Sequence, residues 1–239
     1  ASAQPIRMNA LLEGFKTIFS EDNLRLLLEG TVLTLEVSAV SLLISITLGA
    51  LSGWMRFARV PILAQIAQMH VTLTRGVPLL IQLSFVYYGL PAVGIQLESF
   101  LAGVLALGLY SAAYVSEIVR GGLNSVDLGQ LEAARSLGLS GPQSMRHIIL
   151  PQALVAILPP LGNEYISLIL GSSLISAVTL DDLTRQGVSI IAKTYRQFEV
   201  YTVLAAVYFI ITYTLTLVIG VFERRYLRGR RVEVSRRVI

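Results

Sequence analysis

The chain has 239 residues, of which 54% are hydrophobic and only 14% are charged. Soluble domains carry about 25% charged residues, so this composition excludes an ordinary soluble protein and predicts an integral membrane protein. The absence of cysteine excludes disulfide, iron–sulfur and thiol-based sites, and the net charge of +4 is no evidence for nucleic acid binding. The two histidines, His70 and His147, are far apart in the sequence, so we expect no metal site. We expect one membrane domain over residues 1–239.

The first segments predict a surface helix, a membrane span and a second surface helix. Residues 1–23 mix apolar and charged positions at roughly helical spacing, which is typical of an amphipathic helix lying on a membrane. Residues 26–54 form an apolar run that predicts the first span, and Trp54 lies where an interfacial aromatic residue is common. Residues 62–74 are only moderately apolar, so we expect an interfacial helix there.

Four further apolar stretches predict spans at residues 77–95, 100–119, 154–178 and 203–222. The first of them is short unless the chain continues past Pro91 with a bend. The stretch at 154–178 is the least lipid-like, because it contains Pro159, Pro160 and several polar side chains. Residues 181–200 carry acidic and basic side chains and predict an aqueous segment. The expected fold class is therefore all-α, with five transmembrane helices.

The basic residues predict the orientation of these spans. Five spans place the chain ends on opposite sides of the membrane. The connections after the first and third spans, together with the tail, hold thirteen Lys and Arg residues, whereas the remaining connections hold six. Cytoplasmic segments are the richer in Lys and Arg. We therefore expect the N-terminus outside and the C-terminus in the cytoplasm.

The polar interval at residues 121–153 predicts two short helices joined by a glycine. Residues from Glu132 onwards favour helix, and Gly138 is a natural stop because it accepts the left-handed conformation. Ser140 and Gln143 have the spacing of an N-cap and its capping-box partner, so a second helix should begin there. Pro151 stands where that helix should end or bend.

This interval resembles the EAA loop of ABC importer permeases. The shared pattern is Glu-Ala-Ala, three residues, Gly, nine residues, Ile, one residue, Leu-Pro. In that family the loop is a cytoplasmic coupling helix that docks on a separate ATPase subunit. The pattern without the resemblance leaves open a helical hairpin that has no partner. The coupling residues implied by the resemblance are Glu132, Ala133, Ala134, Gly138, Leu139 and Pro151.

Further motifs resemble the polar amino acid branch of these permeases, the histidine, glutamine and arginine type. The matching stretches are 75–82, 87–91, 113–122, 150–153 and 159–164. The resemblance implies a type I ABC importer fold in a bacterial cytoplasmic (inner) membrane. It also implies a second permease subunit, identical or related, two ABC ATPase subunits that use ATP and Mg, and an external amino-acid-binding protein. Transport would then proceed by alternating access.

The chain itself has no nucleotide-binding loop. Neither of its lysines follows a glycine, so the Gly-Lys-Ser/Thr phosphate-binding motif is absent. If ATP drives transport, a partner chain hydrolyses it. We therefore expect a transporter subunit that is not an enzyme and holds no cofactor of its own.

Glu164 is the leading candidate for a substrate contact. A carboxylate inside an apolar segment is costly and should face a cavity or a cation. An ion pair with an arginine of a neighbouring helix, or a protonated carboxyl bonded to Asn163 or Ser167, is the structural alternative. Pro159 and Pro160 predict a broken helix that exposes backbone groups to a ligand. The substrate-binding candidates are Glu164, Asn163, Ser167, Gln82, Ser172 and Ser173.

Two further expectations concern charged positions. After Ile169 the family commonly has a charged pair, but this chain has Leu170 and Gly171. Either the site is altered or this subunit is the non-binding half of a heterodimer. Glu117 and Arg120 are three residues apart and predict a pair on a helix surface. The alternative function is an ion-coupled secondary transporter that uses Glu164 as its coupling carboxylate.

Overall fold

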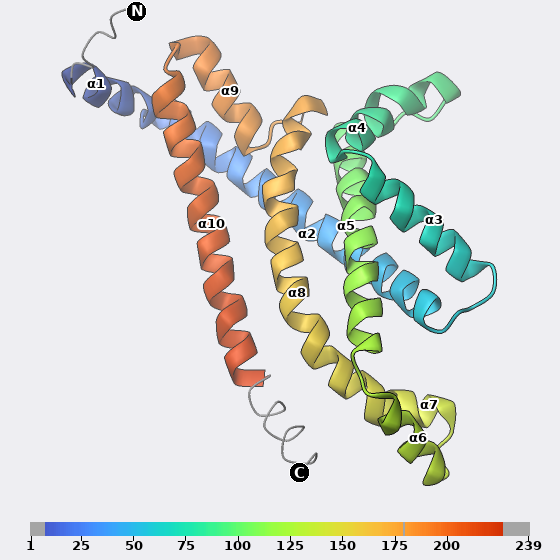
Figure 1. The fold of residues 1–239 in the computed structure, drawn as a ribbon. Coiled ribbons are helices and arrows are strands. Elements are labelled where there is room, and N and C mark those ends of the chain that lie inside the picture. Colours follow the sequence, from blue (N-terminus) through green and yellow to red (C-terminus); the bar gives the residue numbers. More distant parts are fainter. Residues whose placement is uncertain (1–7, 179, 227–239) are drawn as a thin grey trace, which may run out of the picture.

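Long helices form the framework of the molecule (Figure 1). The computed structural model describes residues 8–178 and 180–226, and every regular element in these ranges is helical. α5 packs most extensively on α2 and next on α8, which in turn contacts α10. The all-α prediction is confirmed. The long helices are α2 (Glu21–Phe57), α5 (Ser99–Asn124), α8 (Leu150–Gly171) and α10 (Gln197–Tyr226).

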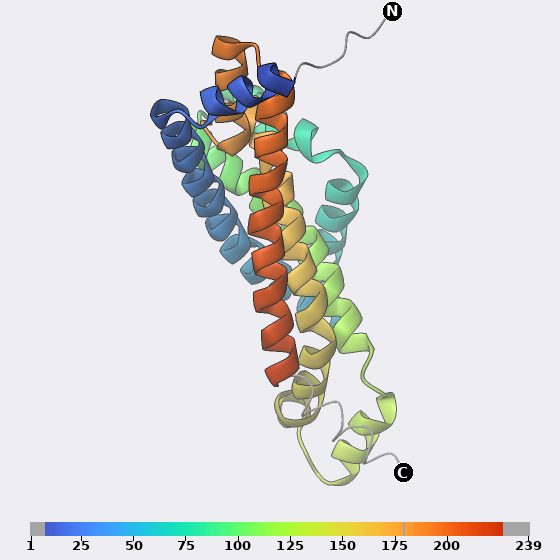
Figure 2. The same cartoon turned by 90° about the vertical axis from the view of Figure 1, so that its left-hand side faces the viewer.

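Shorter helices gather at the two ends of this framework. α1 (Met8–Ile18) and α9 (Leu183–Thr194) lie beside the start of α10, and α6 (Leu128–Ser136) and α7 (Gly141–Ser144) lie at the opposite end (Figures 1 and 2). α1 matches the predicted amphipathic helix, although residues 1–7 lie outside the described part. The segment at 181–200, predicted as aqueous, contains the amphipathic helix α9, whose apolar side packs on α2 and α10.

The second predicted span is bent rather than straight. α3 (Leu63–Gly76) is followed by α4 (Leu79–Ser84), a π turn (η1, Phe85–Gly89) and a 3-10 turn (η2, Leu90–Val93). The segment Leu79–Val93 makes an angle of 107° with α3. By length and composition, four of the described helices can cross a membrane, or five if this bent pair is one span. The predicted stretch at 77–95 therefore crosses only in combination with α3, and the count of five remains a prediction.

The bend follows from Pro78 and is supported by Gln82. A residue before proline avoids the helical region, and Val77 is extended at φ −121° and ψ 133°. Proline has no N–H, so the helical partner of the Thr74 carbonyl is missing. Gln82 Nε2 donates to the carbonyl oxygens of Thr74 and Val77, at 2.8 Å each. The side chain thus satisfies backbone groups that the bend leaves open.

Small residues allow α2 and α5 to pack closely. A Cβ on Gly53 would lie 2.6 Å from the Ser116 carbonyl oxygen, and one on Gly49 would lie 2.8 Å from that of Ala112. The buried Ser45 hydroxyl donates across the same contact to Ser111 Oγ at 2.8 Å. Close backbone approach through small and hydroxyl residues is the usual way that membrane helices associate.

α8 is continuous through Pro159 and Pro160, so the prediction of a broken helix is wrong. Prolines remove backbone donors, but membrane helices tolerate them where neighbouring helices support the segment. α5 and α10 both pack on α8. The helix changes character only at its end, where the 3-10 turn η4 (Ser172–Val178) follows it.

Candidate functional site

The interval between α5 and α8 has the predicted helix, elbow and helix. Gly138 adopts φ +78°, the left-handed conformation, and its N–H donates to the carbonyl of Arg135 at 2.9 Å. The predicted capping box is present, because Ser140 N–H donates to Gln143 Oε1 at 2.8 Å and the Ser140 side chain accepts from the backbone in return. Asp127 caps the first helix, α6, through a bond from Gly129 N–H at 2.7 Å.

The second helix of this interval does not end at Pro151. α7 runs through a π turn (η3, Met145–Ile149) directly into α8, and Pro151 occupies the first turn of α8. The run from Gly141 to Val178 is one continuous, largely apolar helical segment of 38 residues, which we call the rod. Pro151 has no N–H to donate within this run, and the π turn directly before it is the local adjustment through which the helix continues.

The predicted coupling residues divide into exposed and supporting positions. The exposed ones are Glu132, Ala133 and Gly138, and no other described residue pairs with the Glu132 carboxylate. Ala134 is buried, and Leu139 and Pro151 are half-buried. Leu137 was not selected from the sequence, and it is 80% exposed beside the elbow. Its apolar type on a polar interval was the signal, since a large exposed apolar side chain commonly marks a protein contact.

Glu164 faces a cavity of about 670 Å³ between α4, α5 and α8. Ser111 Oγ donates to Glu164 Oε1 at 2.7 Å. Among the described residues no arginine pairs with this carboxylate, so the second oxygen remains available to a ligand. Two tyrosines of α5, Tyr110 and Tyr114, line the same cavity, and their hydroxyls lie 3.0 Å apart.

The structure brings only two of the six candidate binding residues to this cavity, Glu164 and Ser167. Gln82 supports the bend between α3 and α4, and Asn163 is exposed outside the lining. The hydroxyls of Ser172 and Ser173 donate to the carbonyls three residues before them, at 2.6 and 2.8 Å. Gln82, Ser172 and Ser173 therefore already donate hydrogen bonds to carbonyl groups of this chain. The binding roles themselves stay predictions.

Tyr110, Ser111 and Tyr114 were not selected from the sequence. Their spacing of three and four residues places them on one face of α5, which was a usable signal. Gly171 also lines the cavity, with a Cβ position 3.4 Å from Leu79 Cδ2. The charged pair that is missing after Ile169 would therefore have placed a side chain in this cavity.

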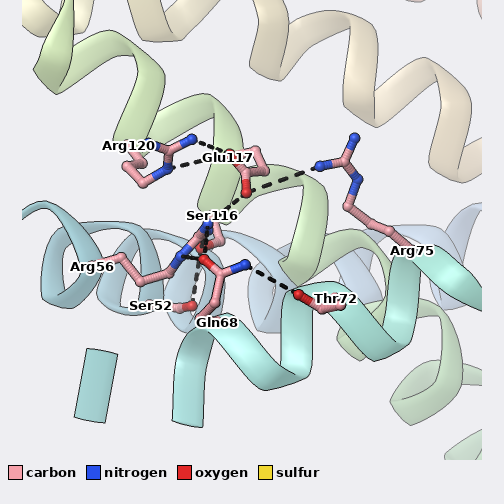
Figure 3. A network of polar contacts seen from close by, with 8 residues as sticks. All are labelled: Ser52, Arg56, Gln68, Thr72, Arg75, Ser116, Glu117 and Arg120. Carbon is pink, nitrogen blue, oxygen red and sulfur yellow. Dashed lines mark hydrogen bonds and ion pairs between the residues drawn. The ribbon is translucent and has the colours of Figure 1, made fainter. Parts of the chain in front are cut away.

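Glu117 is the centre of a network that joins three helices (Figure 3). Its carboxylate lies 2.6 Å from Arg56 Nη2 of α2 and 2.8 Å from Arg120 Nη2 of α5. Arg75, at the end of α3, approaches it to 3.9 Å. The predicted pair between Glu117 and Arg120 is confirmed, and two further arginines from distant parts of the chain also reach the carboxylate, which the sequence did not indicate.

Arg56 and Arg75 extend this network in opposite directions. Arg56 is only 6% exposed and also donates to Gln68 Oε1 of α3 at 2.7 Å and to Ser116 Oγ at 3.0 Å. Arg75 places its guanidinium 5.7 Å from the ring centre of Tyr114, within the range of a cation–π contact. Since Tyr114 lines the Glu164 cavity, Arg75 connects that cavity to the network.

Comparisons with known proteins agree with this architecture. Residues 43–228 match the family described as binding-protein-dependent transport system inner membrane component. The chain is 37% identical over 202 residues to the probable glutamine ABC transporter permease GlnP of Bacillus subtilis, covering 83% of this chain and 93% of that one. It is also 37% identical to the arginine transport system permease ArtQ of the same organism, over 83% of this chain and 91% of the other.

A solved structure, the crystal structure of an amino acid ABC transporter with histidines, superposes with a TM-score of 0.82. It is 37% identical and covers 93% of this chain and all of the other. The prediction of an ABC importer permease is thereby confirmed, and the secondary-transporter alternative gains no support from these relatives. With the match extending over most of its length, the chain belongs to the family of inner membrane components of binding-protein-dependent transport systems.

Proposed function

We propose that this permease carries amino acids and that the cavity at Glu164 is its substrate contact. The cavity is the observation that carries the proposal. A carboxylate with one bonded and one open oxygen accepts bonds from an ammonium or guanidinium group. An α-amino group or a basic side chain would meet that requirement. The relatives named for glutamine and arginine support the substrate class.

Coupling to ATP would occur at the exposed positions of the Glu132–Gly138 interval. We assign ATP hydrolysis, with its Mg, to separate ATPase subunits that dock there. The rod from Gly141 to Val178 supports this assignment, because it carries both the second helix of the loop and Glu164. A displacement at the docking end would reach the cavity through one continuous helix. We propose that this chain and a second permease subunit use such a displacement for alternating access.

The predicted orientation suits this division of roles. The interval between α5 and α8, which we call the docking interval, and the end of α10 lie at one end of the molecule, and α1 and α9 lie at the other (Figure 1). With the Arg-rich end in the cytoplasm, the docking interval meets the compartment that holds ATP. The opposite end would then receive the amino acid from an external binding protein.

The test is ATP hydrolysis by the complex reconstituted with its ATPase and binding protein, across twenty amino acids. We expect stimulation by one chemical class of amino acid. Glu164→Gln should weaken the apparent affinity for that class about tenfold or more, the effect of losing one charged hydrogen bond. Glu36→Gln makes the same change at an exposed carboxylate of α2 and serves as the control.

Two results would contradict the proposal separately. An intact assembly that no amino acid stimulates would exclude the substrate class. Stimulation with the same affinity in wild type and Glu164→Gln would leave the substrate class standing but remove Glu164 from the binding site.

A further inference from the structure

A second cavity, of about 880 Å³, lies apart from the Glu164 site. It is open on one side and is lined by the end of α2, the connection to α3, the outer part of α3 and the last turns of α5. Its charged lining consists of Arg56, Arg59, Glu117 and Arg120. Nothing in the transport cycle described above uses this space.

The charge of this cavity is unbalanced. Three arginines face one carboxylate, which leaves an excess of two positive charges. Arg56 is fully engaged by Glu117, Gln68 and Ser116 (Figure 3). Arg120 is bonded to Glu117 but remains 40% exposed. Arg59 is exposed, and no other described residue bonds to its side chain. An anion at this place would complete the pairing.

The rim of the cavity is apolar. Ile62 is 68% exposed, and Met69 and Leu73 on α3 are each 60% exposed. Side chains of this kind on the outside of a membrane helix contact lipid acyl chains. The cavity therefore combines a basic interior, which suits an anionic headgroup, with an apolar rim, which suits acyl chains. A free inorganic anion would pair with the basic side chains but would leave the apolar rim without a contact.

The position of the cavity along the molecule is consistent with the lipid headgroup region. Arg56 and Arg59 follow the interfacial Trp54, and Arg120 is near the end of α5 that leads to α6. On the orientation proposed above, this is the cytoplasmic side. Basic pockets between membrane helices on that side bind anionic headgroups.

We propose that this cavity binds the phosphate headgroup of an anionic phospholipid, with Arg59 and Arg120 as its contacts. The acyl chains would lie along the exposed side of α3. Glu117 accepts bonds from Arg120 and Arg56, and Arg56 also donates to Gln68 of α3. A lipid bound at Arg120 would therefore stabilise the junction of α2, α3 and α5. This inference depends on the proposed orientation only for the leaflet in which the lipid lies.

The direct test is native mass spectrometry of the assembled complex titrated with phosphatidylglycerol or with phosphatidylcholine. We expect the wild type to retain phosphatidylglycerol preferentially. Arg59→Gln should weaken that retention about fivefold, the factor expected for one basic side chain near an anionic headgroup. Ala64→Phe should weaken it as well, since Ala64 lines the cavity and the change adds bulk without altering charge.

The matched control is Arg224→Gln, which removes one exposed arginine from the end of α10. If Arg59→Gln and Arg224→Gln weaken phosphatidylglycerol retention equally, the effect comes from surface charge in general, and the proposal is overturned. Unchanged retention in both Arg59→Gln and Ala64→Phe would also overturn it. Displacement of the lipid by millimolar inorganic phosphate would identify a free anion as the ligand and remove the lipid from the proposal.

Discussion

Glu117 illustrates how one side chain can hold several helices together. Its carboxylate is bonded to Arg56 and Arg120, and Arg56 is almost fully buried. Removing one partner of a buried pair leaves the other charge without compensation, which costs more than the pair contributes when intact. The stability of the α2–α5 junction should therefore depend more strongly on Glu117 than on either exposed arginine.

We predict that Glu117→Gln lowers the free energy of unfolding by about 2–4 kcal/mol, because it removes the charge that balances Arg56. Arg120→Gln is the comparison, since Arg120 is 40% exposed and such pairs contribute about 0–1 kcal/mol. Thermal unfolding of the purified permease measures both. Equal effects of the two changes would show that Arg56 finds other compensation.

Asp182 is a second residue whose environment predicts a measurable effect. It is the N-cap of α9 and accepts a bond from Arg185 N–H at 2.9 Å, while its other oxygen has no partner among the described residues. Burial raises the pKa of Asp182 from its ordinary 3.8 to about 6. The folded state therefore holds a proton that the unfolded chain has already lost between these two pH values.

The stability contribution of Asp182 should fall as pH rises from about 4 to about 6, and should be constant above that range. Asp182→Asn keeps a good N-cap and removes this slope, so it should raise stability at pH 7 by at most about 3 kcal/mol. A pH series of thermal unfolding for both proteins checks the prediction. An Asn variant that is less stable at pH 7 would show that the charged form is favoured in the fold.

At the scale of elements, the contact between α2 and α5 depends on the absence of side chains. Gly53 and Gly121 both lie in these helices, but only Gly53 meets a neighbouring backbone. We predict that Gly53→Ala destabilises the protein by about 1–3 kcal/mol through overpacking. Gly121→Ala, with nothing within 4 Å of its Cβ, should be neutral or slightly stabilising. Equal changes of the unfolding temperature in Gly53→Ala and Gly121→Ala would exclude close packing at Gly53 as the cause of the destabilisation.

The elbow at Gly138 offers a test of the coupling interval as a unit. At φ +78° an alanine costs about 1–2 kcal/mol, so Gly138→Ala should reorient α6 relative to α7. Gly141→Ala is the control, because its φ is ordinary and its Cβ would meet open space. We expect Gly138→Ala to reduce co-purification of the ATPase and Gly141→Ala to preserve it. If neither substitution changes co-purification of the ATPase, the conformation of Gly138 does not contribute to docking.

Features set by local sequence were predictable at this scale. The capping box at Ser140 and Gln143 and the left-handed Gly138 depend on neighbours within a few residues, so single-sequence rules locate them. The Arg56–Glu117 contact joins positions 61 residues apart, and no local pattern carries that information. The same limit applies to the cavity. Glu164 was recognisable by its charge, but Ser111 reaches it only through packing of α5 on α8.

At the scale of the whole molecule, the proposed docking interval and the Glu164 cavity lie on one continuous run of helix. The rod from Gly141 to Val178 includes the second helix of the interval and Glu164, and the Glu117 network joins α2, α3 and α5, of which α2 and α5 pack on the rod. Because the rod is continuous, a change at the docking end should alter access to the cavity. The continuity of the helix was not predictable from the sequence, since Pro159 and Pro160 indicated a break there.

The absence of cysteine makes that coupling measurable. Ser167→Cys introduces a single thiol at the cavity lining, on the same helix as Glu164. In the assembled complex, its rate of reaction with a small thiol reagent should change about fivefold or more when ATP is added, the lower end of common coupling energies between sites. Thr202→Cys, exposed near the start of α10, should react at one rate throughout.

Adding Gly138→Ala to the Ser167→Cys protein tests whether the rod transmits the change. The elbow variant should abolish the effect of ATP on Ser167→Cys while leaving the rate without nucleotide unaltered, because the substitution lies at the other end of the rod. Persistence of the ATP effect in an intact assembly would show that the cavity responds through another route. A thiol at position 167 that is insensitive to ATP even with Gly138 present would contradict alternating access at this cavity.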